Sequence, residues 1–310
     1  MRVLFWGTPD FATPPLRALV GEGFDVVGVV TQPDRPVGRS RSRVVPPPVK
    51  QVAMEEMIPV LQPERPRGEE FLTQVRELAP DISVVVAYGH ILPREVIELP
   101  ARGTINIHAS LLPALRGAAP IQAAIREGHE RTGVTIMRLV QKLDAGPVLF
   151  QLTTSINDDE TYGELALRLS ELGAAALIES LALMELGKAP ELAQDETQAT
   201  YATKIDRAST RVDWTRDARA VSRTIRAYDS RPGAFTTLDA QDVKLFGARF
   251  APRPESAEPG EVLSIGDDGL VVACGEGAVR LAQLQPSGKK RITAGEWLRG
   301  RGITVGQRFR

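Results

Sequence analysis

The chain has 310 residues, and its 43% hydrophobic content is enough for a sizeable core and favours two domains. The single cysteine, Cys274, excludes an intramolecular disulfide and a cysteine-rich metal site. The formal net charge of −1 is unevenly divided: residues 205–310 hold 18 Lys+Arg against 13 Asp+Glu, an excess of +5, which favours contact of this last third with a polyanion.

The first 108 residues predict an α/β domain. The N-terminal apolar run at 3–6 is too short for a signal peptide, and no run of about 18 apolar residues could span a membrane, so we expect a cytosolic protein. Buried strands are predicted at 3–6, 26–30, 82–87 and 104–108, and helical stretches alternate with them. Continuous β-branched runs in this arrangement indicate a Rossmann-like, doubly wound and mostly parallel sheet. The G-x-G-x-x-G fingerprint of dinucleotide sites is absent, which argues against NAD.

Residues 32–50 are predicted to form an exposed loop after the second strand. They contain five prolines and show no apolar periodicity. Loops of this length inside a compact domain are usually functional or disordered. The arginines in this loop either form a solvated cluster or bind phosphate. They are Arg35, Arg39, Arg41 and Arg43.

The pattern changes from Gly133 onward. Two strands are predicted at 134–140 and 148–156, joined by a turn-rich segment at 141–147. Thr161 and Glu164 have the spacing of a capping box and begin a long helix that ends near Gly187. Residues 188–204 are polar and aperiodic, so we interpret them as a linker.

The last third predicts one helix, at 214–228, and several short strands. The strands are expected at 234–238, 243–250, 260–265, 269–273 and 279–285. Spacing of about ten residues is typical of a small β-barrel, and five-stranded barrels often bind oligonucleotides. The predicted organisation is therefore a catalytic domain over 1–187, a linker over 188–204, and an OB-like C-terminal β-barrel domain over 205–310.

The segment Thr104–His108 contains the most informative residues. On a strand, Asn106 and His108 project to one face while Ile105 and Ile107 enter the core. Polar groups at the carboxyl end of a strand lie where open α/β sheets bind ligands. The pattern Asn-x-His is short, however, and hydrogen-bonded polar residues at the end of any strand could produce it without a catalytic role.

The residues that follow make the pattern specific. A Ser-Leu-Leu-Pro turn at 110–113 comes directly after His108, and Leu143-Asp144-Ala145-Gly146 follows some 36 residues later. Here the chain resembles the folate-dependent formyltransferase family, and in particular those members that act on methionyl-tRNA. The matching segments are GTPDFA at 7–12, TQPDRPVGR at 31–39, VAYGHILP at 86–93, GAAPIQ at 117–122, GVTIM at 133–137 and LQPSGKK at 284–290.

The resemblance implies an activity and a set of site residues. It implies transfer of a formyl group from 10-formyltetrahydrofolate to initiator methionyl-tRNA by a monomer, with no metal. Asn106, His108 and Asp144 would be the catalytic residues. The loop around Arg39 would approach the acceptor end of the tRNA. The folate-binding turn would consist of Ser110, Leu111, Leu112 and Pro113.

The residue types fit this chemistry without the family. Attack of an amine on a formyl carbon creates an oxyanion, and a positioned amide donor such as Asn106 can contribute about 10²–10³ in rate. Histidine is the side chain whose charge changes nearest neutral pH, so His108 can donate to the oxyanion or move a proton. Asp144 can orient the imidazole or relay the amine proton through a water molecule. The residue types alone do not decide how the proton-transfer roles are shared between His108 and Asp144.

Two other functions remain open at this point. A formyltransferase for a small amine, such as a glycinamide nucleotide or an amino-sugar nucleotide, would use the same three residues. The glycinamide substrate would not require the basic last third, and the arginine-rich loop favours tRNA over an amino sugar. An RNA-binding protein with a degenerate catalytic domain is disfavoured because Asn106, His108 and Asp144 are all present.

Overall fold

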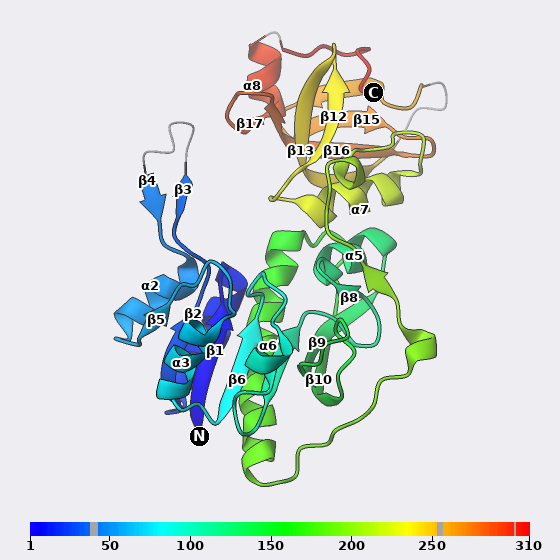
Figure 1. Cartoon of the computed structure of the whole chain (residues 1–310). Coiled ribbons are helices and arrows are strands. Elements are labelled where there is room, and N and C mark those ends of the chain that lie inside the picture. Colours follow the sequence, from blue (N-terminus) through cyan, green and yellow to red (C-terminus); the bar gives the residue numbers. More distant parts are fainter. Residues whose placement is uncertain (38–42, 253–256, 301) are drawn as a thin grey trace. The chain divides into compact units, whose positions relative to one another are not determined.

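The computed structural model describes residues 1–37, 43–252, 257–300 and 302–310, which form two compact units (Figure 1). The first unit consists of residues 1–117, 132–154 and 166–201, and the second of 118–131, 155–165 and 202–310. Membership therefore alternates along the chain. The division into 1–187, 188–204 and 205–310 stays a prediction about sequence modules.

The first unit is built on a seven-stranded sheet with the order β10-β9-β7-β6-β1-β2-β5. Strand β1 pairs in parallel with β2 and β6, β2 with β5, and β6 with β7, whereas β9 runs antiparallel to β7. This confirms the mostly parallel sheet predicted from the buried β-branched runs. The strands are β1 (Arg2–Gly7), β2 (Asp25–Val30), β5 (Val60–Leu61), β6 (Ile82–Val86), β7 (Thr104–His108), β9 (Arg131–Arg138) and β10 (Val148–Ser155).

Helices lie between these strands in the sequence. Long helix α6 (Tyr162–Glu185) begins at the predicted capping box, since the Thr161 N–H donates to Glu164 at 2.9 Å and the Glu164 N–H donates to Thr161 Oγ1 at 3.4 Å. None of the helices in the described residues combines the length and apolarity needed to cross a bilayer. Helix α6 belongs to the first unit only from Ala166 onward. The helices that lie wholly within this unit are α1 (Thr13–Gly21), α2 (Pro48–Glu55), α3 (Glu69–Glu77) and α4 (Arg94–Ile97).

The segment predicted as one irregular loop at 32–50 is more ordered than expected. It contains a short antiparallel pair, β3 (Arg35–Val37) and β4 (Arg43–Val45), and its last residues start α2 (Figure 1). The expectation of irregular structure was therefore wrong at both flanks. A three-residue ladder is held by backbone hydrogen bonds and needs no apolar periodicity, so the sequence pattern did not reveal it.

The second unit combines helices with an antiparallel sheet, and two of these helices pack together. Helix α5 (Pro120–Glu127) packs against α7 (Ala218–Tyr228), and Arg126 Nη1 donates to the Tyr228 hydroxyl at 3.2 Å. Helix α7 starts later than the predicted 214, because the Asp217 carboxylate caps it by accepting from the Ala220 N–H at 2.9 Å.

The sheet has the order β12-β13-β16-β15-β14, with β17 paired to β16, and every pairing is antiparallel. The fold class is thus confirmed as a Rossmann-like sheet followed by a small antiparallel β domain. The elements are β12 (Ala234–Leu238), β13 (Gln241–Ala251), β14 (Val262–Gly266), β15 (Gly269–Ala273), β16 (Ala278–Pro286), β17 (Ile292–Thr293) and the short helix α8 (Ala294–Arg299).

Candidate active site

Strand β7 presents two polar side chains at the carboxyl end of the sheet, as the alternation predicted. Asn106 and His108 lie opposite Met137 and Thr135 of β9, while Ile105 and Ile107 are buried on the other face. Within the described residues, the Asn106 side chain has no hydrogen-bond partner. Its two N–H groups are therefore available to a ligand at the end of the strand.

The His108 imidazole is held in one orientation. It is 6% exposed, and its Nε2 lies 2.9 Å from the carbonyl oxygen of Leu115. Because a carbonyl oxygen can only accept, Nε2 carries a hydrogen. Nδ1 lies 3.7 Å from Asp144 Oδ2, which is within electrostatic reach but beyond a direct hydrogen bond. Nδ1 is consequently the nitrogen that can gain or lose a proton.

Asp144 lies in a tightly seated turn between β9 and β10. Its Oδ2 accepts from the Gly117 backbone N–H at 2.7 Å, and its φ of 47° places it in the left-handed region that few non-glycine residues occupy. Two residues later, a Cβ added at Gly146 would lie 1.8 Å from the Arg138 carbonyl oxygen. The turn therefore fits closely against β9 and aims the carboxylate at His108.

The predicted folate-binding turn, residues 110–113, is braced by two strands. Thr135 Oγ1 of β9 donates to the Ser110 carbonyl at 2.7 Å and accepts from the Leu112 N–H at 3.1 Å. Gln151 Nε2 of β10 donates to the Leu112 carbonyl at 2.9 Å. The sequence reasoning missed Thr135 and Gln151; a polar residue inside each predicted strand was the only signal for them.

A second group that sequence reasoning did not assign surrounds Arg116. The Arg116 side chain is 0% exposed, and its Nη1 and Nη2 donate to the two carboxylate oxygens of Glu196, each at 3.1 Å. These hydrogen bonds, with a further one from Lys142, lower the pKa of Glu196 to about 2 and raise the pKa of Arg116. Arg116 Nη2 also donates to Gln194 Oε1 at 2.7 Å. Lys142 lies in the segment predicted to be turn-rich, and Gln194 and Glu196 lie in the predicted linker.

The arginines of the 32–50 segment are only partly described. Arg35 is exposed on β3, and its Nη2 donates to Gln32 Oε1 at 3.4 Å. Arg43 begins β4. Arg39 and Arg41 lie outside the described residues, so the predicted tRNA-contact role of the four arginines stays a prediction.

The remaining chemically active side chains are dispersed. His90 and His129 are exposed. Tyr88 is 2% exposed, and burial raises its pKa to about 12. In the described part of the chain, no cluster of three or more His, Cys, Asp or Glu side chains has the arrangement of a metal site.

Two family models match the chain and together span most of it. Residues 1–181 match a model described as formyl transferase, and residues 204–302 match one described as formyl transferase, C-terminal domain. The methionyl-tRNA formyltransferases of Bacillus thuringiensis (strain Al Hakam) and Bacillus cereus (strain AH820) are each 47% identical over 310 residues, covering 100% of this chain and 98% of theirs.

Solved structures share the fold at lower identity. HypX from Aquifex aeolicus in complex with tetrahydrofolic acid gives a TM-score of 0.68 at 22% identity, over 96% of this chain and 47% of that one. The sugar 3N-formyl transferase WlaRD gives 0.68 at 15% identity, over 94% and 99%. A methionyl-tRNA formyltransferase from Clostridium thermocellum gives 0.60 at 14% identity, over 91% and 98%.

Proposed function

Because the chain belongs to the formyl transferase family, we propose that it transfers the formyl group of 10-formyltetrahydrofolate to the amino group of initiator methionyl-tRNA. The observation that carries this proposal is 47% identity, over the full length of the chain, to methionyl-tRNA formyltransferases. An amino-sugar nucleotide is not favoured as the acceptor, since the relatives that match the whole chain at 47% identity are methionyl-tRNA formyltransferases.

Asn106 is suited to stabilise the transition state. Attack by the methionyl amine forms a nitrogen–carbon bond and places negative charge on the formyl oxygen. An amide N–H of Asn106 can donate to that oxygen without any change in its own charge. The amide needs no rearrangement to do so, because no described residue occupies its donors.

His108 and Asp144 are suited to manage the protons. Collapse of the tetrahedral intermediate breaks the bond between the formyl carbon and the folate nitrogen. The amine therefore loses one proton, and the folate nitrogen gains one. His108 Nδ1 is the free position of a ring whose Nε2 hydrogen is held by Leu115, and Asp144 lies 3.7 Å away to stabilise a positive ring. No serine or cysteine nucleophile is required, because the amine attacks directly.

Two further parts of the proposal concern the substrates. Residues 110–113 are proposed to bind the folate, and hydrogen bonds to Thr135 and Gln151 brace that turn. The excess of +5 over residues 205–310 supports contact with tRNA phosphates, as do Arg35, Arg39, Arg41 and Arg43.

A formylation assay with competing acceptors tests the proposal. The protein is supplied with 10-formyltetrahydrofolate and either charged initiator tRNA, a glycinamide nucleotide or an amino-sugar nucleotide. We expect formylation of the charged tRNA alone, with binding that weakens steeply as salt is raised. Faster turnover of either small amine, or tRNA binding independent of salt, would contradict the proposed acceptor.

A further inference from the structure

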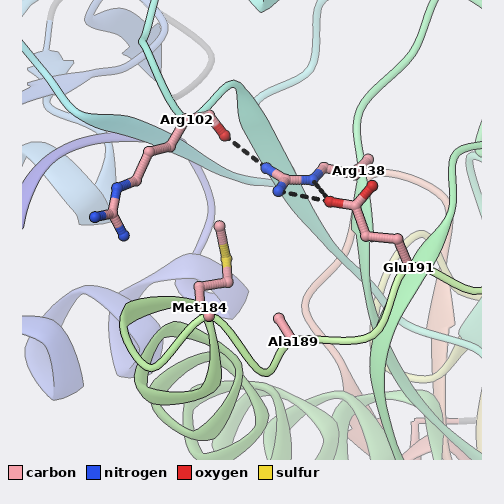
Figure 2. A pocket seen from close by; sticks show the side chains of 6 residues that line it. Arg102, Arg138, Met184, Ala189 and Glu191 are labelled. Atoms are coloured by element: carbon pink, nitrogen blue, oxygen red, sulfur yellow. Dashed lines mark hydrogen bonds and ion pairs between the residues drawn. The ribbon is translucent and has the colours of Figure 1, made fainter.

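The segment predicted as a linker is fastened to the turns of the active site. Arg138 Nε donates to Glu191 Oε1 at 2.8 Å while its Nη1 donates to the Arg102 carbonyl at 2.6 Å, and Figure 2 shows this anchor at the wall of a cavity of about 300 Å³. Leu192 then pairs with Val148 through two backbone hydrogen bonds. Gln194 follows directly on this anchored stretch.

The Gln194 amide connects two turns that hold proposed site residues. Its Nε2 donates to the carbonyl oxygens of Asp144 and Gly146, both at 2.8 Å. Its Oε1 accepts from Arg116 Nε at 3.1 Å and from Nη2 at 2.7 Å. The backbone N–H that follows Arg116, on Gly117, donates to the Asp144 carboxylate. Gln194 thus holds the backbone carbonyl of Asp144 directly. It also holds Arg116, which precedes the residue whose N–H donates to the Asp144 carboxylate.

Only one orientation of this amide satisfies its surroundings. The side facing the turn offers two carbonyl oxygens, which only accept, and the side facing Arg116 offers only donors. If the amide were flipped, its oxygen would face the two carbonyl oxygens of the turn and its N–H groups would face the Arg116 guanidinium, so these hydrogen bonds could not form. All four hydrogen-bonding positions of Gln194 are consequently used. A carboxylate of the same size could replace the contacts with Arg116 but not those with the turn.

We infer that Gln194 is a positioning residue for Asp144: it holds the 144–146 turn so that the carboxylate faces His108 Nδ1. The left-handed Asp144 conformation is intrinsically unfavourable and needs such external support. The inference rests on the proposed function, because it assigns Gln194 a part in formyl transfer. It predicts a loss in turnover that exceeds any loss in substrate binding.

The test compares Gln194→Glu with Gln198→Glu in the full-length protein. Gln198 lies in the same segment, and among the described residues its amide donates to Asp195 Oδ2 alone, at 2.9 Å, so this control makes the same chemical change away from the turn. We expect kcat of Gln194→Glu to fall about 10-fold to 100-fold, with KM for charged initiator tRNA changed less than about 3-fold. Hydrogen exchange of the Gly117 amide, which donates to Asp144, should accelerate about 10-fold or more.

The two readouts separate the inference from the proposed function. If the wild type formylates charged tRNA but Gln194→Glu matches Gln198→Glu in kcat and in Gly117 exchange, the inference is overturned. If the wild type does not formylate the tRNA, the proposed function fails, and Gly117 exchange still decides whether Gln194 holds the turn. Should Gln194→Glu not fold, Gln194→Asn provides the same comparison, because its shorter amide cannot reach both carbonyls and Arg116.

Discussion

Replacing Gly146 with alanine tests how closely the Asp144 turn must fit. The added Cβ would lie 1.8 Å from the Arg138 carbonyl oxygen, and such contacts do not occur below 3.0 Å, so the two must separate by about 1.2 Å. Arg138 lies in β9, where it pairs with Ile105 of β7, so we expect the turn to move instead of the strand. Misplacement of a reacting group by about 1 Å can cost on the order of 10²-fold in rate. We therefore expect kcat to fall about 100-fold.

The assay measures initial formylation rates at saturating 10-formyltetrahydrofolate and charged initiator tRNA, together with thermal unfolding. Gly21→Ala is the matched control, because nothing lies within 4 Å of a Cβ at that helical position and alanine raises helix stability by up to about 1 kcal/mol. A folded Gly146→Ala protein with kcat within about 3-fold of wild type would refute the argument that the turn has no room to move.

Three further predictions concern single side chains. Asn106→Ala and His108→Ala should each lower kcat by about 10² or more with nearly unchanged tRNA affinity, as measured by single-turnover kinetics and filter binding; wild-type turnover would remove either residue from the mechanism. Burial raises the pKa of Tyr88 to about 12, so between pH 10 and 12 the unfolded chain loses the phenol proton before the folded protein does, and the free energy of unfolding falls as pH rises across this window. Across that window the wild type should lose on the order of 2 kcal/mol relative to Tyr88→Phe in urea unfolding, and parallel pH curves would contradict this. Arg116 lowers the pKa of Glu196 to about 2, so this ion pair should stabilise fully above about pH 4.5 and lose its effect as pH falls to 2. Glu196→Gln should accordingly be less stable than wild type at pH 7, with a difference that disappears near pH 2.

Strands β7 and β15 were predictable because most of their side chains are buried on both faces. Strand β7 matches the predicted Thr104–His108 at both ends, and β15 matches Gly269–Ala273. A strand that is buried on both faces requires a continuous apolar run, and such a run can be recognised in the sequence. The proposed pairing of His108 with Asp144 was suggested only by the family resemblance, since 36 residues separate them and no local pattern joins them.

The supports of the site could not be predicted from the sequence. Gln194 and Glu196 lie in an aperiodic polar segment whose role depends on hydrogen bonds to distant backbone and to Arg116. Such bonds impose no spacing of apolar residues. Likewise, no local pattern of the sequence reveals that Asp144 adopts the left-handed conformation.

The alternation of the two units along the chain limits how this protein can be recombined. Helix α5 is encoded before the end of the first unit, yet the helix it packs on, α7, begins only at Ala218. During synthesis, therefore, nearly 100 residues of chain must follow α5 before the helix that it packs on exists. A chimera joined once, near residue 204, would supply α7 from one parent and α5 from the other. To exchange the whole second unit, a chimera must therefore transfer residues 118–131 and 155–165 together with residues 202–310.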